Sequence, residues 1–444
     1  MKQTIRLSDH FGYGRLLRFT MPSILMMVFT SIYGVVDGFF VSNYVGKTPF
    51  AAVNLIMPFL MVVGAMGFMF GTGGSALIAK TMGEGNQEKA QKIFSLIVYA
   101  TAISGIVIAA VSIIFLRSVA VFLGADGKML ADCVLYGRMI LLSLPFLMLQ
   151  YAFASLVVTA EKPKLGLAVT IVAGVTNMVG DALFIAVFHW GVAGAAAATA
   201  LGQVLGGIIP LVYFARKNSS RLRLCKPKWD GRALKKVCTN GSSELMSNIS
   251  MSLVSMLYNV QLMKYAGENG VAAYGTLMYV NFVFIAIFIG YATGAAPVFS
   301  YHYCAANKEE LRGLLRKSLV IILFSSAAMF GISEVMARVV AGVFVGYDET
   351  LFQMTVQAFR IFAFSFLFAG MSIFGSAFFT ALNDGLTSAL ISFLRTLVFQ
   401  CLAVLVLPHF FELNGIWYSS VAAEVLSVVV TVIFLIGLRK KYQY

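Results

Sequence analysis

Charged residues are scarce in this sequence. Only 12% of its 444 residues are Asp, Glu, Lys or Arg, whereas 59% are hydrophobic. A water-soluble domain ordinarily carries about 25% charged residues, so a chain this apolar cannot hide its hydrophobic side chains in a soluble core and most of it must face lipid. The expected fold is an all-α membrane protein, because a helix satisfies its own backbone hydrogen bonds inside a bilayer.

Cysteine and histidine are also few. The five cysteines show no CxxC or other paired spacing, which argues against both disulfides and a metal cluster. The four histidines lie in the tails or near the ends of apolar runs, and the sequence contains no HExxH, GxSxG or phosphate-binding loop. We therefore expect a protein that is not an enzyme and that needs no cofactor.

Long apolar runs dominate the sequence instead. Crossing a hydrocarbon layer of about 30 Å takes roughly 20 apolar residues in a helix. About twelve runs of this length can be read from the chain, over residues 15–43, 51–79, 94–116, 133–158, 164–188, 191–215, 236–263, 272–299, 315–343, 356–380, 386–410 and 415–438. The sequence thus predicts twelve transmembrane helices.

The basic residues are unevenly placed. The formal net charge of +14 would by itself allow a nucleic-acid partner. Most of the 33 Lys and Arg, however, fall in the two tails and in alternate loops, with a dense run from Arg216 to Lys236. This is the positive-inside pattern. It predicts a multi-pass protein of the bacterial inner (plasma) membrane with both termini cytoplasmic, and no nucleic-acid partner.

The two halves of the chain resemble each other. A shift of 221 residues places Asn86 on Asn307 and aligns the halves almost without gaps, over six expected helices each. An even number of spans gives both repeats the same orientation, related by a pseudo-twofold axis along the membrane normal. We expect a six-helix lobe over 1–215, a cytoplasmic basic linker over 216–236 and a second six-helix lobe over 237–444, with a substrate cavity between the lobes.

Polar residues inside the expected spans are the candidates for function, since a buried charge costs several kcal/mol unless it meets a cavity or a partner. Asp37 lies in the first span, and Asn177 and Asp181 lie one turn apart on the same face of the fifth. Thr199, early in the sixth span, could add a hydroxyl at the same depth. Such oxygens suit Na⁺, and two close carboxylates also hold a proton near neutral pH. The alternative is that both acids only bond to nearby backbone or cap helix ends.

The second half of the chain lacks these acids. Tyr258 and Leu402 stand at the repeat positions of the two aspartates. Arg395 and Glu424, in the eleventh and twelfth spans, are interpreted as a structural ion pair, because a buried Arg usually needs an acid. Glu244 lies near the cytoplasmic mouth of the seventh span, where water makes a charge inexpensive.

Methionine and aromatic side chains can line a cavity that adapts to many shapes. Most of the 22 Met and 38 Phe must simply face lipid. The candidates for a substrate cavity are Tyr33, Met66, Tyr136, Phe153 and Met178.

Short motifs surround the polar residues. Asp37 is followed by Gly-Phe-Phe-Val, and Asn177-x-x-x-Asp181 is followed by Ala-Leu-Phe-Ile. Gly415-Ile-Trp417 opens the last span. Together with the repeat, these motifs run the length of the chain and resemble those of the multidrug and toxic compound extrusion (MATE) family.

The resemblance implies a V-shaped pair of lobes with alternating access, exchanging external H⁺ or Na⁺ for small, often cationic organic compounds. It implies that the four polar residues of the first, fifth and sixth spans form the cation site and that Tyr33 and Tyr136 line the cavity. Essential acids in the seventh and tenth spans of some members have no match here, since Glu244 lies too early. The expected protein is a monomeric antiporter whose partners are lipophilic cations and membrane lipid.

Other functions remain open for this architecture. A flippase for a lipid-linked precursor tends to carry extra helices and cavity-lining arginines, whereas Arg395 has a plausible acid partner here. A channel would need filter residues, and no such motif is visible. A major-facilitator transporter would carry a basic Gly-x-x-x-Asp-Arg signature after the second span, where this chain has Gly83-Glu-Gly-Asn-Gln-Glu-Lys.

Overall fold

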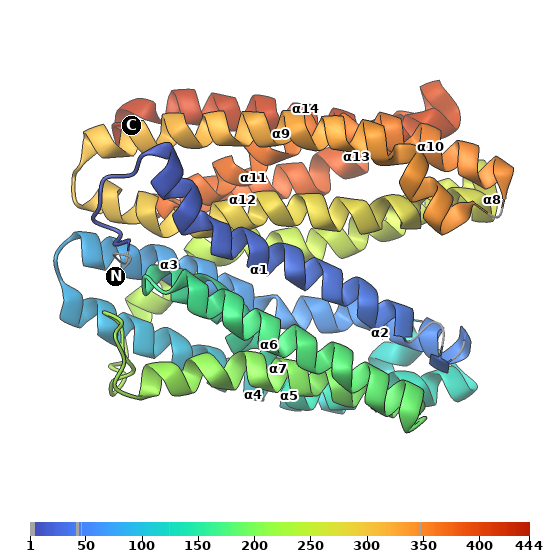
Figure 1. Cartoon of the computed structure of the whole chain (residues 1–444), viewed down its shortest axis with the longest axis horizontal. Helices are drawn as coiled ribbons and strands as arrows, with labels where there is room; N and C mark the ends of the chain where they lie inside the picture. The colour runs from blue at the N-terminus through green and yellow to red at the C-terminus, as the bar shows by residue number, and fades with distance from the viewer. Residues whose placement is uncertain (1–4, 41–43, 46, 124, 347) are drawn as a thin grey trace.

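The chain folds into long helices arranged as two bundles (Figure 1). The computed structural model describes residues 5–40, 44–45, 47–123, 125–346 and 348–444. In chain order the helices are α1 (Tyr13–Phe40), α2 (Lys47–Gly64), α3 (Met66–Gly83), α4 (Gln87–Phe122), α5 (Gly127–Thr159), α6 (Pro163–Asp181), the π-helix η2 (Ala182–Val187), α7 (Gly191–Ala215), α8 (Gly231–Cys304), α9 (Lys308–Val345), α10 (Glu349–Ala363), α11 (Phe366–Ala381), α12 (Gly385–Phe393), the π-helix η3 (Leu394–Val398), α13 (Phe399–Val406), α14 (Pro408–Gly437) and α15 (Arg439–Tyr442).

The prediction of an all-α multi-pass membrane protein is confirmed. Among the described residues, ten helical segments are long and apolar enough to cross a membrane, or up to eleven if α10 and α11, which meet at 47°, form one bent span. The remaining expected span is the first arm of α8, where Asn240, Glu244 and Asn248 lower the apolar character. α8 is two helices joined at Gly267, whose φ of 59° and ψ of −149° suit glycine.

The repeat is visible in the local backbone. Asn86 caps α4 by accepting a hydrogen bond from the backbone N–H three residues on, and Asn307 caps α9 in the same way. The residue before each cap, Gly85 in the first half and Ala306 in the second, has a positive φ of 79° and 55° respectively. Equivalent sequence positions therefore start equivalent helices, because an Asn side chain satisfies a backbone donor that the helix leaves free.

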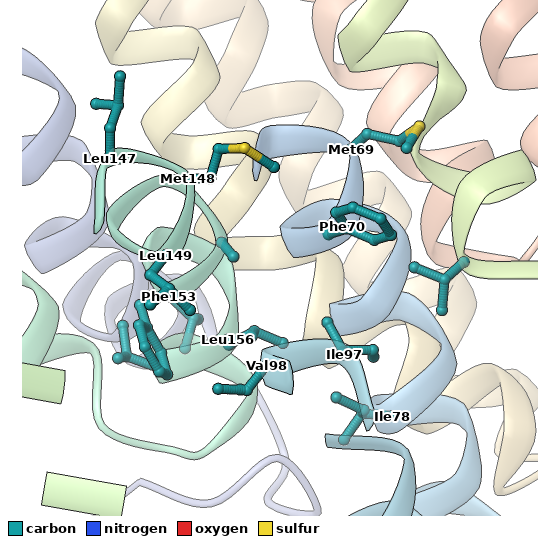
Figure 2. Packing of buried hydrophobic residues seen from close by; sticks show 14 of the residues in the cluster. Met69, Phe70, Ile78, Ile97, Val98, Leu147, Met148, Leu149, Phe153 and Leu156 are labelled. Carbon is teal, nitrogen blue, oxygen red and sulfur yellow. The ribbon is translucent and has the colours of Figure 1, made fainter. Parts of the chain in front are cut away.

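Buried apolar side chains form two clusters, and the larger one continues from the first half into the second through residues such as Phe288 and Phe378. In the first half, Phe70 of α3, Ile97 of α4 and Leu156 of α5 belong to one cluster, seen from close by in Figure 2. In the second half, Phe359 of α10 and Trp417 of α14 belong to another. Long apolar helices thus bury one face against their neighbours and leave other faces exposed, as expected for a bundle surrounded by lipid.

The two halves meet close to the end of the molecule where both chain termini lie (Figure 1), called here the termini end. α1 packs on α8, and α3 packs on both arms of α8. A Cβ on Gly73 of α3 would lie 2.0 Å from the carbonyl oxygen of Val237, and a Cβ on Gly241 would lie 1.9 Å from the α3 backbone. Only glycine allows backbones to approach this closely, so the halves are tightly closed here.

The segment before α1 crosses the termini end and ties the halves together. The backbone N–H of Leu7 donates to Glu161 Oε1, just after α5, at 2.8 Å. The backbone N–H of Phe11 donates to Glu310 Oε1, at the start of α9, at 2.8 Å, and His10 Nδ1 lies 2.6 Å from Glu310 Oε2. One short segment therefore binds a carboxylate from each half.

The connection between the halves also lies at the termini end. It runs from residue 216 to residue 230, because Asp230 caps α8 by accepting a hydrogen bond from the backbone N–H of Ala233 at 3.0 Å. The last part of the expected linker, from Gly231 to Lys236, is therefore helical and belongs to α8.

Candidate functional site

Asn177 of α6 meets Thr199 of α7, and Asp181 lies one helical turn further along α6. Asn177 Nδ2 lies 3.4 Å from Thr199 Oγ1. The side chains of Asn177 and Asp181 are 4% and 0% exposed. The helices approach closely because α7 has a glycine opposite: a Cβ on Gly202 would lie 3.3 Å from Asn177 Cβ. The fold thus brings a buried carboxamide to a half-buried hydroxyl, with a buried carboxylate one helical turn away.

The free amide oxygen of this group is notable chemically. Among the described residues, none donates a hydrogen bond to Asn177 Oδ1, although that atom is buried. A buried acceptor without a donor is costly in a protein interior. A buried oxygen without a donor is well suited to bind a cation, because Na⁺ is coordinated by carbonyl, hydroxyl and carboxylate oxygens.

α1 runs beside α6 in the same direction (Figure 1). Tyr33 of α1 packs on Gly174 of α6, where a Cβ would lie 2.9 Å from Tyr33 Cδ1. About one turn further along both helices, α1 carries position 37 and α6 carries Asn177. The helical register therefore places these two positions at the same depth, while the side chain of Asp37 lies outside the described part of the structure.

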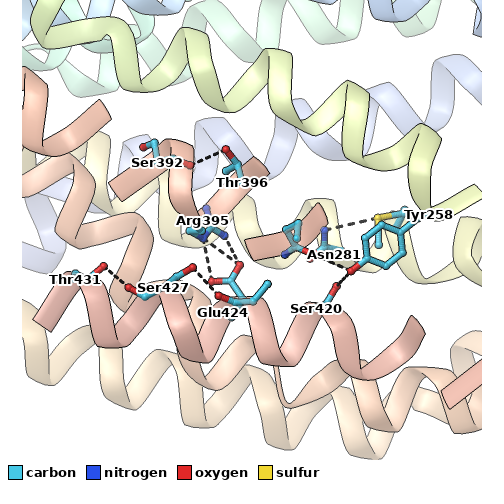
Figure 3. Close-up of polar contacts among 12 residues, drawn as sticks. Tyr258, Asn281, Ser392, Arg395, Thr396, Ser420, Glu424, Ser427 and Thr431 are labelled. Carbon is cyan, nitrogen blue, oxygen red and sulfur yellow. Dashed lines mark hydrogen bonds and ion pairs between the residues drawn. The ribbon is translucent and has the colours of Figure 1, made fainter. Parts of the chain in front are cut away.

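The second half holds a neutral counterpart of this group. Tyr258 and Ser420 stand 221 residues after the predicted cation-site positions 37 and 199. Tyr258 Oη lies 3.1 Å from Ser420 Oγ and donates to Gln400 Oε1 at 2.8 Å (Figure 3). Leu402, at the repeat position of the second aspartate, is 55% exposed. Phenol, amide and hydroxyl groups thus satisfy one another here without a carboxylate.

Arg395 and Glu424 lie in direct contact, as their predicted pairing requires (Figure 3). Arg395 Nε lies 3.0 Å from both carboxylate oxygens of Glu424, and Nη2 lies 2.7 Å from Oε1. Their side chains are only 17% and 7% exposed. Glu244, on the first arm of α8, is half-buried, and its position near the cytoplasmic mouth stays a prediction.

The first half encloses a small pocket nearer the termini end than Asn177. Its volume is about 40 Å³, with walls from α1, α3, α5, α6 and α7. Phe153 lines it, as do Thr30, Gln150 and Thr170. A space of this size has room for a few waters but not for an organic molecule. Gln150 escaped the sequence reasoning, although a carboxamide within an apolar span was a usable signal.

The other four cavity candidates lie outside the lining of this pocket. Tyr136 is 1% exposed and belongs to the larger of the two buried clusters. Tyr33, Met66 and Met178 are half-buried, on α1, α3 and α6. Their role in contacting a substrate stays a prediction.

The fold and these buried polar groups define a class of protein. It is a multi-pass helical membrane protein made of two related halves, and the first half carries oxygen-bearing side chains of the kind that bind cations. Comparison with known families is consistent with this class. The MatE family model matches residues 22–183 and again residues 245–405. The chain therefore belongs to the MatE family, as the sequence motifs indicated, and each half is a copy of the family's unit.

Individual relatives agree over nearly the whole chain. The chain is 23% identical over 434 residues to multidrug export protein MepA of Staphylococcus haemolyticus, covering 96% of this chain and 94% of that protein. The same figures hold for MepA of Staphylococcus aureus strain NCTC 8325.

Solved structures share the fold. A multidrug resistance MATE family transporter in an outward-facing conformation has a TM-score of 0.93 at 23% identity, covering 100% of this chain and 98% of that one. A MATE protein in its straight conformation has a TM-score of 0.92 at 22% identity, with 100% and 98% covered. At this level of identity the likeness establishes the architecture of the chain.

Proposed function

We propose that this protein is an antiporter of the bacterial plasma membrane that exports small, often cationic organic compounds in exchange for H⁺ or Na⁺. Family membership and the multidrug export function named for the MepA relatives support this assignment. The observation that supports the coupling mechanism is the contact of buried Asn177 with Thr199, one helical turn from the buried Asp181. The protein works as a monomer in lipid and needs no cofactor beyond the coupling ion.

The coupling site is assigned to Asp37, Asn177, Asp181 and Thr199. The register of α1 against α6 supports including Asp37, and so does the contact between the repeat equivalents of positions 37 and 199 in the second half. Two acids within about one helical turn of each other in depth can exchange a proton or Na⁺ for the positive charge of a substrate. Binding of one cation then weakens the hold on the other, which is the thermodynamic requirement for exchange.

Transport proceeds by alternating access. The structure is closed at the termini end by the packing of α1 and α3 on α8. With the termini in the cytoplasm, this state faces outward, the conformation named for a relative of high structural similarity. Release of the α3–α8 contact would open the protein to the cytoplasm.

The flippase alternative is disfavoured by the second half. A lipid pyrophosphate needs an arginine with free donors, but Arg395 is already engaged by Glu424 through Nε and Nη2.

The test is efflux of a fluorescent cation from vesicles under an imposed pH gradient and, separately, a Na⁺ gradient. Asp37→Asn and Asp181→Asn remove a charge at nearly constant size and should insert and fold normally but lose gradient-driven export. Leu402→Met is the matched control, because the repeat equivalent of Asp181 is 55% exposed and apolar. Normal export by either Asn variant would refute the coupling site, and loss of thermal stability in detergent would assign the acids a structural role.

A further inference from the structure

A large cleft lies at the termini end, between the start of α4 and the start of α8. Its volume is about 800 Å³. Four basic side chains line it: Lys89 and Lys92 from α4, Lys228 from the connection between the halves, and Arg232 from α8. Two acids also lie in the lining, Glu88 and Asp230.

The acids are already engaged. Glu88 pairs with Lys92 at 2.5 Å, and Asp230 accepts the capping hydrogen bond at the start of α8. Within the described part of the chain, no ion pair joins Lys89, Lys228 or Arg232 to an acid. Three basic groups therefore face the cleft without a partner, and the cleft favours an anion.

Trp229 adds an aromatic group to the same rim. Its side chain is 79% exposed, although tryptophan usually finds a buried or interfacial place. Tryptophan beside lysine and arginine is typical of the zone where a helix bundle leaves the hydrocarbon and enters the headgroups. An exposed indole next to a basic cleft thus points to contact with lipid.

One face of α4 continues from the cleft into the span. Lys92 is followed at helical spacings of four and three residues by Leu96, Tyr99, Ile103 and Ile106. Leu96 lies in the cleft lining. Tyr99, Ile103 and Ile106 are 44%, 61% and 59% exposed. The basic cleft therefore lies at one end of a row of exposed apolar side chains on α4, with the buried Leu96 between the cleft and that row.

We propose that this cleft binds the headgroup of an anionic phospholipid from the cytoplasmic leaflet, with an acyl chain lying along the α4 row. Lys89, Lys228 and Arg232 bind the phosphate, and Trp229 lies at the headgroup level. A free phosphate ion would use the basic groups but not the α4 row. The second half offers no equivalent site, because Glu310 and Gly313 stand where the first half has Lys89 and Lys92.

The natural tryptophans provide the assay. The chain has three: Trp229 in the cleft, Trp190 at 55% exposure on another loop, and Trp417 at 2% exposure in the core. In a Trp190→Phe background, Trp229 is the accessible reporter. The full chain is placed in mixed vesicles in which either phosphatidylglycerol or phosphatidylcholine carries brominated acyl chains, at equal mole fractions. Brominated phosphatidylglycerol should quench Trp229 more strongly, and equal quenching by both lipids would overturn the proposal.

Charge variants separate specific binding from general attraction to the membrane. Lys228→Gln alone, in an exposed non-helical segment where misfolding is not expected, should reduce the preference for phosphatidylglycerol about fivefold. Lys89→Gln combined with Lys228→Gln and Arg232→Gln should abolish it. The matched control is Lys164→Gln with Lys217→Gln, two exposed basic residues outside the cleft. A control variant that loses as much preference as the triple variant would overturn the site.

A final arm distinguishes lipid from soluble phosphate. In neutral detergent, millimolar inorganic phosphate or glycerol 3-phosphate should leave Trp229 fluorescence unchanged, whereas short-chain phosphatidylglycerol should shift it. An equal response to the soluble phosphates would show that the α4 row is not used and would overturn the assignment to lipid.

Discussion

Replacing Gly73 with alanine should open the termini end. Gly73 of α3 lies so close to the first arm of α8 that a Cβ would be 2.0 Å from the carbonyl oxygen of Val237 and 2.7 Å from the amide nitrogen of Gly241. Both are backbone atoms. The clash can therefore be relieved only if α3 and α8 move apart, and not by the rotation of a side chain.

The size of the effect follows from the cost of overpacking. Adding a group to a filled interface costs about 1–3 kcal/mol. This cost falls on the closed state, because the two helices separate when the termini end opens. A bias of about 1–3 kcal/mol changes the ratio of two states by about 5- to 150-fold, so Gly73→Ala should raise the open population by a factor in that range.

Cys238 is the natural probe of this opening. It is half-buried on the same arm of α8, next to Val237. In a protein that keeps Cys238 as its single cysteine, Gly73→Ala should accelerate labelling by a water-soluble thiol reagent. Gly331→Ala on α9 is the control, because a Cβ there meets nothing within 4 Å. An unchanged labelling rate in a folded Gly73→Ala variant would refute the closed interface, and an equal increase in both variants would indicate general loosening instead.

Two further predictions concern charges in the second half. Arg395→Gln should lower stability by about 3–5 kcal/mol, since it leaves Glu424 buried without its partner, whereas the double change Arg395→Met with Glu424→Leu should recover most of the loss in a thermal unfolding assay. Burial pushes the pKa of Asp384 up, but hydrogen bonds from Tyr442 and Thr387 outweigh it and hold that pKa below its ordinary value. Because the folded pKa is lowered, this carboxylate stabilises docking of the C-terminal tail above the unfolded value of about 3.9 and loses that effect as pH falls through the folded pKa. Limited proteolysis of the tail should therefore accelerate only in acid, and Asp384→Asn should show no such pH dependence.

The helical architecture was predictable because it depends on local sequence. Long apolar runs specify spans without reference to distant residues, and the alignment of Asn86 with Asn307 corresponds to two caps with the same geometry. The first arm of α8 was also expected as a span from its apolar run, although its polar residues make it less apolar than the other spans. The end of the linker was misplaced, since basic composition continues past Asp230 into the helix.

Contacts between distant segments could be predicted only where a buried charged side chain needs a partner of opposite charge. A buried arginine requires an acid, so the pairing of Arg395 with Glu424 followed from the cost of leaving it alone. No such demand marks Gly73 and Gly241, whose contact depends on how two halves of the chain are packed. The cleft lined by Lys89 and Lys228 likewise could not be predicted, because each lysine alone looks like an ordinary surface residue in the sequence.

The two halves share one backbone plan but differ in charge, and this difference explains why we assign coupling to the first half. Tyr258, Gln400 and Ser420 satisfy one another at 2.8 and 3.1 Å, so that group presents no vacant charged ligand to a cation. Glu424, one helical turn along α14 from Ser420, is paired with Arg395. In the first half, by contrast, Asn177 Oδ1 is a buried oxygen to which no described residue donates a hydrogen bond. Asp181 lies one helical turn from Asn177. Since a coupling cation needs oxygen ligands that protein donors do not already occupy, we expect the first half to be the one that binds it.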